Sequence, residues 1–346
     1  MTSQPTDALE RYLQDAAQRH ANELFLIPGE PVSYRIRGSI ERDEGDVLTA
    51  EQVESVAAAA VGDEGLAKIG TQTGELTAPY HIPEVLNAQV CVAKACGVYT
   101  VAARVLPTGL FDVDAIGLPQ AVIDACDARN GLVIVSGPVG SGKTTTAYVI
   151  VDDINRRKPV HICTVEDPVA VRLTPKKALI QQRSVGVDAP SCLAAIRAAM
   201  RQDFDVLFVA EMRTPEEVQA CVTAAETFAL VIAQVHARSP QAAIQRLIDV
   251  QPHATRNAFR KALADALRVV LVQCLPRKAD GKGRVAAYGV LIPDDDVRSA
   301  IVEGRDPFDR TSPLPEGCQT LAEHFEQLIR DGIVTEEAAR ESLGEA

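Results

Sequence analysis

The chain has 346 residues, of which 47% are apolar and 24% are charged, a composition typical of a folded protein long enough for about two domains. Its 47 acidic residues outnumber 35 lysines and arginines, and the resulting formal charge of −12 argues against nucleic acid as a partner. No apolar run reaches the roughly 18 residues of a membrane-spanning helix, and the N-terminus lacks a signal-peptide pattern, so we expect a cytoplasmic protein.

The N-terminal part of the chain predicts a small α+β domain. After an opening helix, short apolar segments at 24–27 and 33–37 are separated by turn residues, a pattern typical of hairpins. The stretch that follows is rich in proline and glycine and lacks periodicity, which indicates a linker at 107–118. We therefore expect an N-terminal domain at 1–106 and a second domain at 119–346.

Strand and helix patterns alternate in the second domain. Short apolar runs that predict buried strands lie at 132–135, 160–165, 206–209 and 229–235. An amphipathic helix follows each run, and capping signals open two of these helices, at Thr214-Pro215-Glu216-Glu217 and Ser239-Pro240. This alternation predicts a parallel sheet with helices on both faces.

The pattern changes toward the C-terminus. Apolar runs at 269–275 and 285–292 flank Asp280-Gly281 and predict an antiparallel hairpin with a basic, solvated tip. From residue 294 onward the sequence indicates helices, with a capping box at Thr320 and a helix end at Gly332.

A glycine-rich segment follows the first strand of the second domain. Gly137-Pro138-Val139-Gly140-Ser141-Gly142-Lys143-Thr144 fits the phosphate-loop pattern GxxxxGK[ST] and lies between a buried strand and an amphipathic helix. Its backbone N–H groups and the helix N-terminus can face one anion, Lys143 can neutralise phosphates, and the Thr144 hydroxyl can ligate Mg²⁺. A glycine-rich turn without a ligand is the alternative, and the strand and helix on either side argue against it. The residues expected to bind nucleotide are Gly137, Val139, Gly140, Ser141, Gly142, Lys143, Thr144 and Thr145.

Polar side chains follow three of the predicted strands. Glu166 and Glu211 each come at the end of an apolar strand, where a parallel sheet presents them beside the phosphate loop. Such carboxylates can hold the metal shell or polarise an attacking water, although a helix N-terminal acid facing solvent is the alternative for either one. His236 ends a third strand and could sense the γ-phosphate or serve the structure alone.

Short blocks of sequence, in order along the chain, resemble one known family. They are residues 137–146, 164–168, 182–186, 197–203, 211–213, 224–227 and 297–304. In these blocks the chain resembles the type IV pilus retraction ATPases (PilT-like), which belong to the type II/IV secretion ATPase superfamily. The likeness extends over the whole chain.

The resemblance implies a fold and a function. It implies an α/β, RecA-like P-loop ATPase core with a parallel sheet, a smaller N-terminal α+β (PAS-like) domain and C-terminal helices. It further implies a homohexameric ring at the cytoplasmic face of the inner membrane, in which ATP and Mg²⁺ lie between the N-terminal domain of one subunit and the core of the next. Hydrolysis would drive pilus retraction through an inner-membrane platform protein. By the resemblance, Glu166 belongs to the acidic box, Glu211 is the Walker B glutamate and His236 the retained histidine of the His box.

The chain departs from the family pattern near these residues. Ala210 and Thr214 stand at the ends of the block that usually reads Gly-Glu-Met-Arg-Asp. Residues 226–229 read Glu-Thr-Phe-Ala where the family reads Glu-Thr-Gly-His, so the first histidine of the His box is missing. Gln234 and Arg238 flank His236 where threonine and asparagine are common.

Arginines are also missing from the N-terminal domain. Gln89 and Cys96 replace two family arginines, Lys94 replaces a third, and Arg104 is retained. Because a trans-acting arginine is worth about 10³- to 10⁵-fold in rate, we expect MgATP binding with slow hydrolysis, and work in a mixed ring or beside a sister ATPase. The arginines that could complete the site are Arg104, Arg183, Arg201 and Arg213.

Other functions fit parts of the same pattern. A non-motor, ATP-binding regulatory paralogue of the pilus machine is one alternative, and a conjugation-type secretion ATPase is another. A nucleotide kinase shares the loop sequence but normally carries it near its N-terminus. The acidic charge disfavours nucleic-acid translocation.

Overall fold

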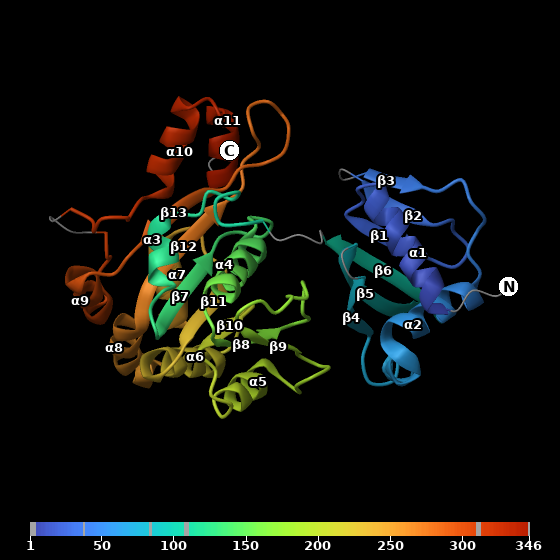
Figure 1. Ribbon diagram of the computed structural model, residues 1–346, viewed down its shortest axis with the longest axis horizontal. Helices are drawn as coiled ribbons and strands as arrows, with labels where there is room; N and C mark the ends of the chain where they lie inside the picture. Colours follow the sequence, from blue (N-terminus) through green and yellow to red (C-terminus); the bar gives the residue numbers. More distant parts are fainter. Residues whose placement is uncertain (1–4, 37–38, 83–84, 107–110, 309–312, 345–346) are drawn as a thin grey trace. The chain divides into compact units, whose positions relative to one another are not determined.

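The computed structural model describes residues 5–36, 39–82, 85–106, 111–308 and 313–344, which form two compact units (Figure 1). The first unit comprises residues 1–109 and 168–172, and the second comprises 110–167 and 173–346. The predicted linker begins at residues 107–110, which lie outside the described residues. Its remaining residues include a turn closed by a hydrogen bond of 3.0 Å from the Gly117 amide to the Asp114 carbonyl.

The first unit is built on an antiparallel sheet of six strands in the order β3-β2-β1-β6-β5-β4. The strands are β1 (Glu23–Leu26), β2 (Ser33–Ile36), β3 (Ser39–Arg42), β4 (Glu75–Ile82), β5 (Leu86–Ala95) and β6 (Val98–Leu106). Helices α1 (Pro5–Gln18) and α2 (Ala50–Lys68) pack against each other and against this sheet. The predicted α+β fold and its first hairpin are confirmed.

Apolar spacing fixes the helices on this sheet. α1 buries Leu9, Leu13 and Ala16, which recur at i, i+4 and i+7 and so share one face of the helix. α2 starts at a capping box, in which Thr49 accepts the Gln52 amide hydrogen and the Gln52 side chain accepts that of Thr49. These contacts join the helices and the sheet in one apolar core.

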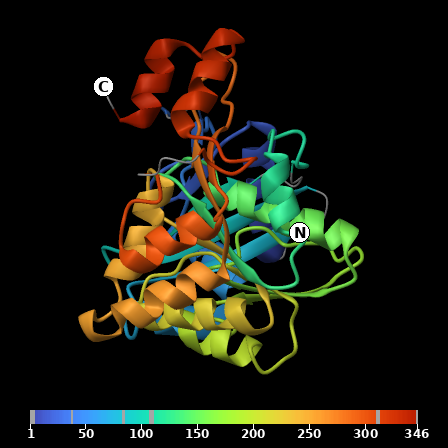
Figure 2. The same cartoon turned by 90° about the vertical axis from the view of Figure 1, so that its left-hand side faces the viewer.

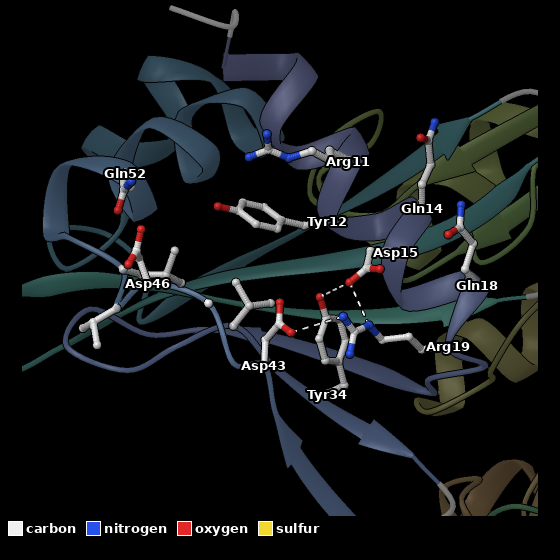
Figure 3. Close-up of a pocket in the computed structure, with 14 residues that line it drawn as sticks. Arg11, Tyr12, Gln14, Asp15, Gln18, Arg19, Tyr34, Asp43, Asp46 and Gln52 are labelled. Carbon is white, nitrogen blue, oxygen red and sulfur yellow. Dashed lines mark hydrogen bonds and ion pairs between the residues drawn. The ribbon is translucent and has the colours of Figure 1, made fainter.

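A cavity of about 570 Å³ lies beside α1 (Figure 3). The Tyr34 hydroxyl donates to Asp15 at 2.5 Å, and the Arg19 guanidinium donates to Asp15 at 2.9 Å and to Asp43 at 3.2 Å. Arg19 also lies over the Tyr34 ring, 4.8 Å from its centre. Burial and the Asp15 carboxylate raise the pKa of Tyr34. These groups satisfy one another, so we assign them to the stability of the fold.

The second unit contains a sheet of seven strands in the order β13-β12-β7-β11-β10-β8-β9. The strands are β7 (Gly131–Ser136), β8 (His161–Glu166), β9 (Leu179–Ser184), β10 (Val206–Val209), β11 (Leu230–Val235), β12 (Leu267–Cys274) and β13 (Ala287–Leu291). All neighbours are parallel except β12 and β13, which form the predicted antiparallel hairpin. The parallel sheet is confirmed, and β9 is an edge strand that the sequence pattern missed.

Helices cover both faces of this sheet, as predicted. They are α3 (Gln120–Ala125), α4 (Lys143–Arg157), α5 (Cys192–Ala199), α6 (Pro215–Thr227), α7 (Pro240–Asp249), the 3₁₀ turn η1 (His253–Thr255), α8 (Arg256–Ala266), α9 (Asp295–Glu303), α10 (Leu321–Arg330) and α11 (Glu336–Leu343). α5 to α9 share a core with Leu132 and Ile134, whereas α4 packs on the face of Val133 and Val135. The predicted caps at Thr214, Ser239 and Thr320 are present.

The C-terminal part differs from its prediction in one respect. Gly304 adopts a left-handed conformation that ends α9, and the described residues between α9 and α10 are not helical. In this stretch Gln319 pairs with Val290 of β13 instead. α10 and α11 then pack together over the ends of β12 and β13, and Figure 2 shows them as a separate layer at the top of this unit. Among the described residues, no helix is long and apolar enough to cross a membrane.

The Tyr34 hydroxyl provides a test of the network beside α1. Tyr34→Phe removes one hydrogen bond to a carboxylate, and we expect the free energy of unfolding to fall by about 1 kcal/mol in urea denaturation. Tyr12→Phe is the matched control, because Tyr12 lines the same cavity and its hydroxyl makes no hydrogen bond within the described part of the chain. Equal stability of the two variants would contradict the assignment.

Candidate functional site

The phosphate loop joins β7 to α4 at the carboxyl end of the parallel strands. Every residue of β7 is buried, and α4 begins at Lys143. Gly137 and Gly142 have φ angles of 149° and 85°. A Cβ at Gly137 would lie 2.3 Å from the Gln273 carbonyl oxygen, and one at Gly142 would lie 2.8 Å from the Gln273 side chain. Both positions therefore require glycine, while Val139 is exposed at the tip of the loop.

Lys143 is folded against its own loop. Its Nζ donates to the Pro138 carbonyl at 2.7 Å, and the residue is only 6% exposed. Burial lowers the pKa of Lys143, and the Glu211 carboxylate acts in the opposite direction. The Lys143 ammonium and the Glu211 carboxylate therefore interact electrostatically.

Two buried glutamines, on the two strands that flank β7, form hydrogen bonds to the loop and the start of α4. The Gln273 amide donates to the Ser141 carbonyl at 2.7 Å and accepts from the Thr146 hydroxyl at 2.6 Å. The Gln234 carbonyl accepts from the Thr144 hydroxyl at 3.2 Å. Neither role was predicted from the sequence. The signal that could have found them is a single polar residue near the end of an otherwise apolar strand.

Glu211 and His236 meet at the same edge of the sheet. They follow the adjacent parallel strands β10 and β11, and the His236 Nε2 lies 3.5 Å from the Glu211 Oε1. The Glu211 side chain is 34% exposed, so solvent reaches it. The structure thus brings together Lys143, Glu211 and His236, three of the side chains that the sequence singles out.

Arg213 occupies the other side of the Glu211 carboxylate. Its guanidinium pairs with Glu211 at 2.9 Å and with Asp167 at 3.0 Å, which joins the ends of β10 and β8. The hydrogen bond to Glu211 raises the pKa of Arg213. Two other arginine candidates lie elsewhere: Arg183 donates to Gln202, and Arg104 is exposed on β6, opposite Glu23 of β1.

Glu166 has a different environment. The residue is 2% exposed, and its carboxylate accepts from the Thr164 hydroxyl at 2.6 Å, from the Tyr148 hydroxyl and from the Gln182 amide at 3.4 Å. Tyr148 comes from α4 and Gln182 from the edge strand β9. These donors fix the end of β8 against α4. The catalytic role of Glu166 stays a prediction.

Several buried polar atoms of the site lack a hydrogen-bond partner among the described residues. In the described part of the chain, Ser141 Oγ, Gln234 Nε2 and His236 Nδ1 are buried without a hydrogen-bond partner. An unpaired buried polar group costs about 1–3 kcal/mol, so such groups usually mark a binding site or an ordered water. Their position beside the glycine loop fits an oxygen-rich anion such as a nucleotide phosphate.

A cavity of about 510 Å³ adjoins the start of α4 in the same unit. Thr145 and Gly142 line it on the side of the loop, and Tyr288, His324 and Ile116 line it farther away. The Tyr288 amide donates to the His324 Nδ1 at 2.9 Å, and the Tyr288 hydroxyl donates to the Ile116 carbonyl at 2.9 Å. The two rings lie 6.0 Å apart and are tilted by 31°. This half-apolar wall is suited to a planar heterocycle.

Comparison with known proteins gives consistent results. The family model described as "Type II/IV secretion system protein" matches residues 100–335. The chain is 31% identical over 309 residues to a twitching motility protein of Neisseria gonorrhoeae, covering 88% of this chain and 82% of that protein. It is also 31% identical over 334 residues to the type IV pilus retraction ATPase PilT of Pseudomonas aeruginosa, covering 94% and 95% of the two chains.

Solved structures support the fold. The crystal structure of the pilus retraction motor PilT with bound ADP matches with a TM-score of 0.87 at 32% identity and covers 96% of each chain. The Legionella pneumophila ATPase DotB matches with a TM-score of 0.85 over 99% of this chain and 96% of that one. At 19% identity this second likeness shows the fold alone. The RecA-like α/β core expected from the sequence is confirmed.

His324 gives the cavity wall a testable pH dependence. Burial lowers the pKa of His324, so as the pH falls below its ordinary pKa of about 6.5 the unfolded chain binds the proton before the folded chain does. The stabilisation is fully present above pH of about 6.5 and is lost as the pH falls below it. His324→Asn keeps an acceptor for the Tyr288 amide and cannot titrate. We therefore expect wild type to lose stability relative to this variant on acidification, in thermal unfolding between neutral and mildly acidic pH.

The control replaces a histidine outside the cavity. His20 is exposed and has a φ of 55°, a conformation that asparagine tolerates. His20→Asn should keep the pH dependence of wild type, because it leaves His324 in place. A constant difference between wild type and His324→Asn would contradict the assignment.

Proposed function

The chain belongs to the type II/IV secretion system protein family and is a PilT-like ATPase, and from this premise we propose that it is a motor subunit that drives retraction of a type IV pilus. The observation that carries the proposal is the meeting of Lys143, Glu211 and His236 beside the glycine loop. Relatives named for twitching motility and pilus retraction, matched over most of their length, support the retraction assignment.

The ligand that we propose is ATP with Mg²⁺. The loop amides, the helix N-terminus and the unpartnered Ser141 Oγ suit phosphate oxygens, and the cavity wall at Tyr288 and His324 suits the base. Thr144, whose hydroxyl is already oriented by Gln234, would ligate Mg²⁺ together with the phosphates. When bound, Mg²⁺ neutralises phosphate charge and polarises the terminal phosphoryl group.

The residues around the loop have distinct roles in the proposed hydrolysis. A water oxygen attacks the γ-phosphorus, the bond to the bridging oxygen breaks, and ADP and phosphate leave. Glu211 accepts the proton of the attacking water, since its carboxylate is partly exposed to solvent and interacts electrostatically with Lys143 of the loop. His236 holds the Glu211 carboxylate from β11, and Lys143 stabilises the charge that develops on the phosphates.

We propose that the subunit works in a homohexameric ring at the cytoplasmic face of the inner membrane. In the ring, the N-terminal domain, 1–106, of one subunit would close on the core, 119–346, of its neighbour and transmit work to a platform protein. Lys94 lies over Tyr99, 4.6 Å from the ring centre, and Gln89 lies opposite Arg104 on β5 and β6. With the family arginines replaced at this surface, turnover by the chain alone would be slow, and a sister ATPase would supply the faster sites.

Substitution of Glu211 tests the proposed base. We expect Glu211→Gln to lower the single-turnover hydrolysis rate by about 10²- to 10⁴-fold and to leave nucleotide affinity nearly unchanged. Lys143→Ala should weaken nucleotide binding itself by at least about tenfold, because a buried cation is lost from the phosphates. Glu216→Gln, at an exposed carboxylate in the first turn of α6, is the matched control and should behave as wild type. Unchanged hydrolysis by Glu211→Gln would contradict the assignment.

Turnover and assembly, measured together, test the motor. We expect the purified chain to form a ring by mass measurement with nucleotide and to hydrolyse ATP slowly in the steady state. Turnover at a rate typical of active motors, abolished by Lys143→Ala, would contradict the slow-turnover part. A chain that binds ATP and never hydrolyses it in single-turnover assays would instead be a regulatory paralogue.

A further inference from the structure

Gln234 is a buried amide on a central strand. It lies next to the end of β11, between β7 and β10, and is 4% exposed. Leu230 and Ile232, which share its face of the strand, are apolar and fully buried. An amide in this position has to be satisfied by hydrogen bonds, because burial removes it from water.

Only one end of this amide has a partner in the described part of the chain. The Gln234 Oε1 accepts from the Thr144 hydroxyl at 3.2 Å, whereas its Nε2 is buried and unpartnered. Thr144 belongs to the phosphate loop and the first turn of α4, so the amide lies beside the phosphate-loop site with its donor unused by the described residues.

We propose that Gln234 is a positioning residue for the magnesium nucleotide, an inference that rests on the proposed function. By accepting the Thr144 proton, its Oε1 turns the lone pairs of that hydroxyl toward the metal. Its Nε2 donates to an oxygen of the terminal phosphate. The Gln234 amide thus orients Thr144, the proposed magnesium ligand, and distinguishes ATP from ADP through its contact with the γ-phosphate.

Gln234 lies close to His236 at the same end of β11. His236 lies two residues farther on, and its Nε2 is 3.5 Å from the Glu211 carboxylate. The same strand end therefore carries a group that faces the phosphates and a group that holds the carboxylate proposed as base. Loss of the γ-phosphate releases the Gln234 amide and alters the support of Glu211.

The test measures equilibrium binding of fluorescent ATP and ADP analogues, each with Mg²⁺ and with EDTA. Gln234→Met keeps the side-chain volume and removes both hydrogen bonds. We expect it to reduce the Mg²⁺-dependent gain in ATP affinity by about tenfold, while ADP affinity in EDTA stays within about twofold of wild type because ADP lacks the γ-phosphate contact. Gln245→Met, at an exposed glutamine of α7, is the control and should retain the full gain.

A second variant separates the two ends of the amide. Gln234→Glu keeps an acceptor for Thr144 and replaces the donor by an acidic oxygen. We expect it to retain most of the Mg²⁺ gain and to lose the preference for ATP over ADP by about tenfold, since the carboxylate faces the γ-phosphate. Equal weakening of ATP and ADP would overturn the assignment of Nε2.

A double-mutant cycle completes the experiment. In a Thr144→Val background, Gln234→Met should change the Mg²⁺ gain by less than about twofold, because both residues act on one metal position. A full and independent effect of Gln234→Met in that background would overturn the proposal, as would an unchanged Mg²⁺ gain in the single variant. If wild type binds neither nucleotide, the proposed function itself fails, and the two failures are thus distinguished.

Discussion

The close approach of a glycine loop to two polar strand ends is the constraint on which this site depends. Gly137 and Gly142 bring the loop backbone against Gln273, and any side chain at these positions would collide with it. Gln273 then ties the carbonyl of Ser141 to the first turn of α4 through Thr146. The loop conformation is therefore held by the sheet before any ligand arrives, so little reorganisation is needed for binding.

Electrostatic pairing arranges the groups around this loop. Lys143 is buried and shares its environment with Glu211, and Glu211 is held by His236 on one side and Arg213 on the other. These side chains follow three neighbouring strands of the parallel sheet, β7, β11 and β10, so the sheet sets their spacing. A carboxylate held in this way is restrained in direction and remains open to solvent, which is what a general base requires.

Much of this arrangement could be predicted from residue patterns. The strand at 206–209 and the capping box at Thr214 appear as expected, because continuous apolar runs and local capping chemistry are short-range signals. The edge strand β9 was missed, since Leu179 is its most exposed residue and polar side chains follow. The burial of Glu166 among Tyr148, Thr164 and Gln182 could not be predicted, because it depends on contacts between distant segments. The same holds for the two glutamines that brace the loop.

We propose that this edge of the sheet binds a nucleoside triphosphate with Glu211 next to its terminal phosphate. A crystal structure with Mg²⁺ and a non-hydrolysable ATP analogue tests it most directly. We expect the Lys143 Nζ to leave the Pro138 carbonyl for a phosphate oxygen at about 2.7–3.2 Å, with a water between Glu211 and the γ-phosphorus. Phosphates bound away from Lys143, or Glu211 turned away from them, would contradict it.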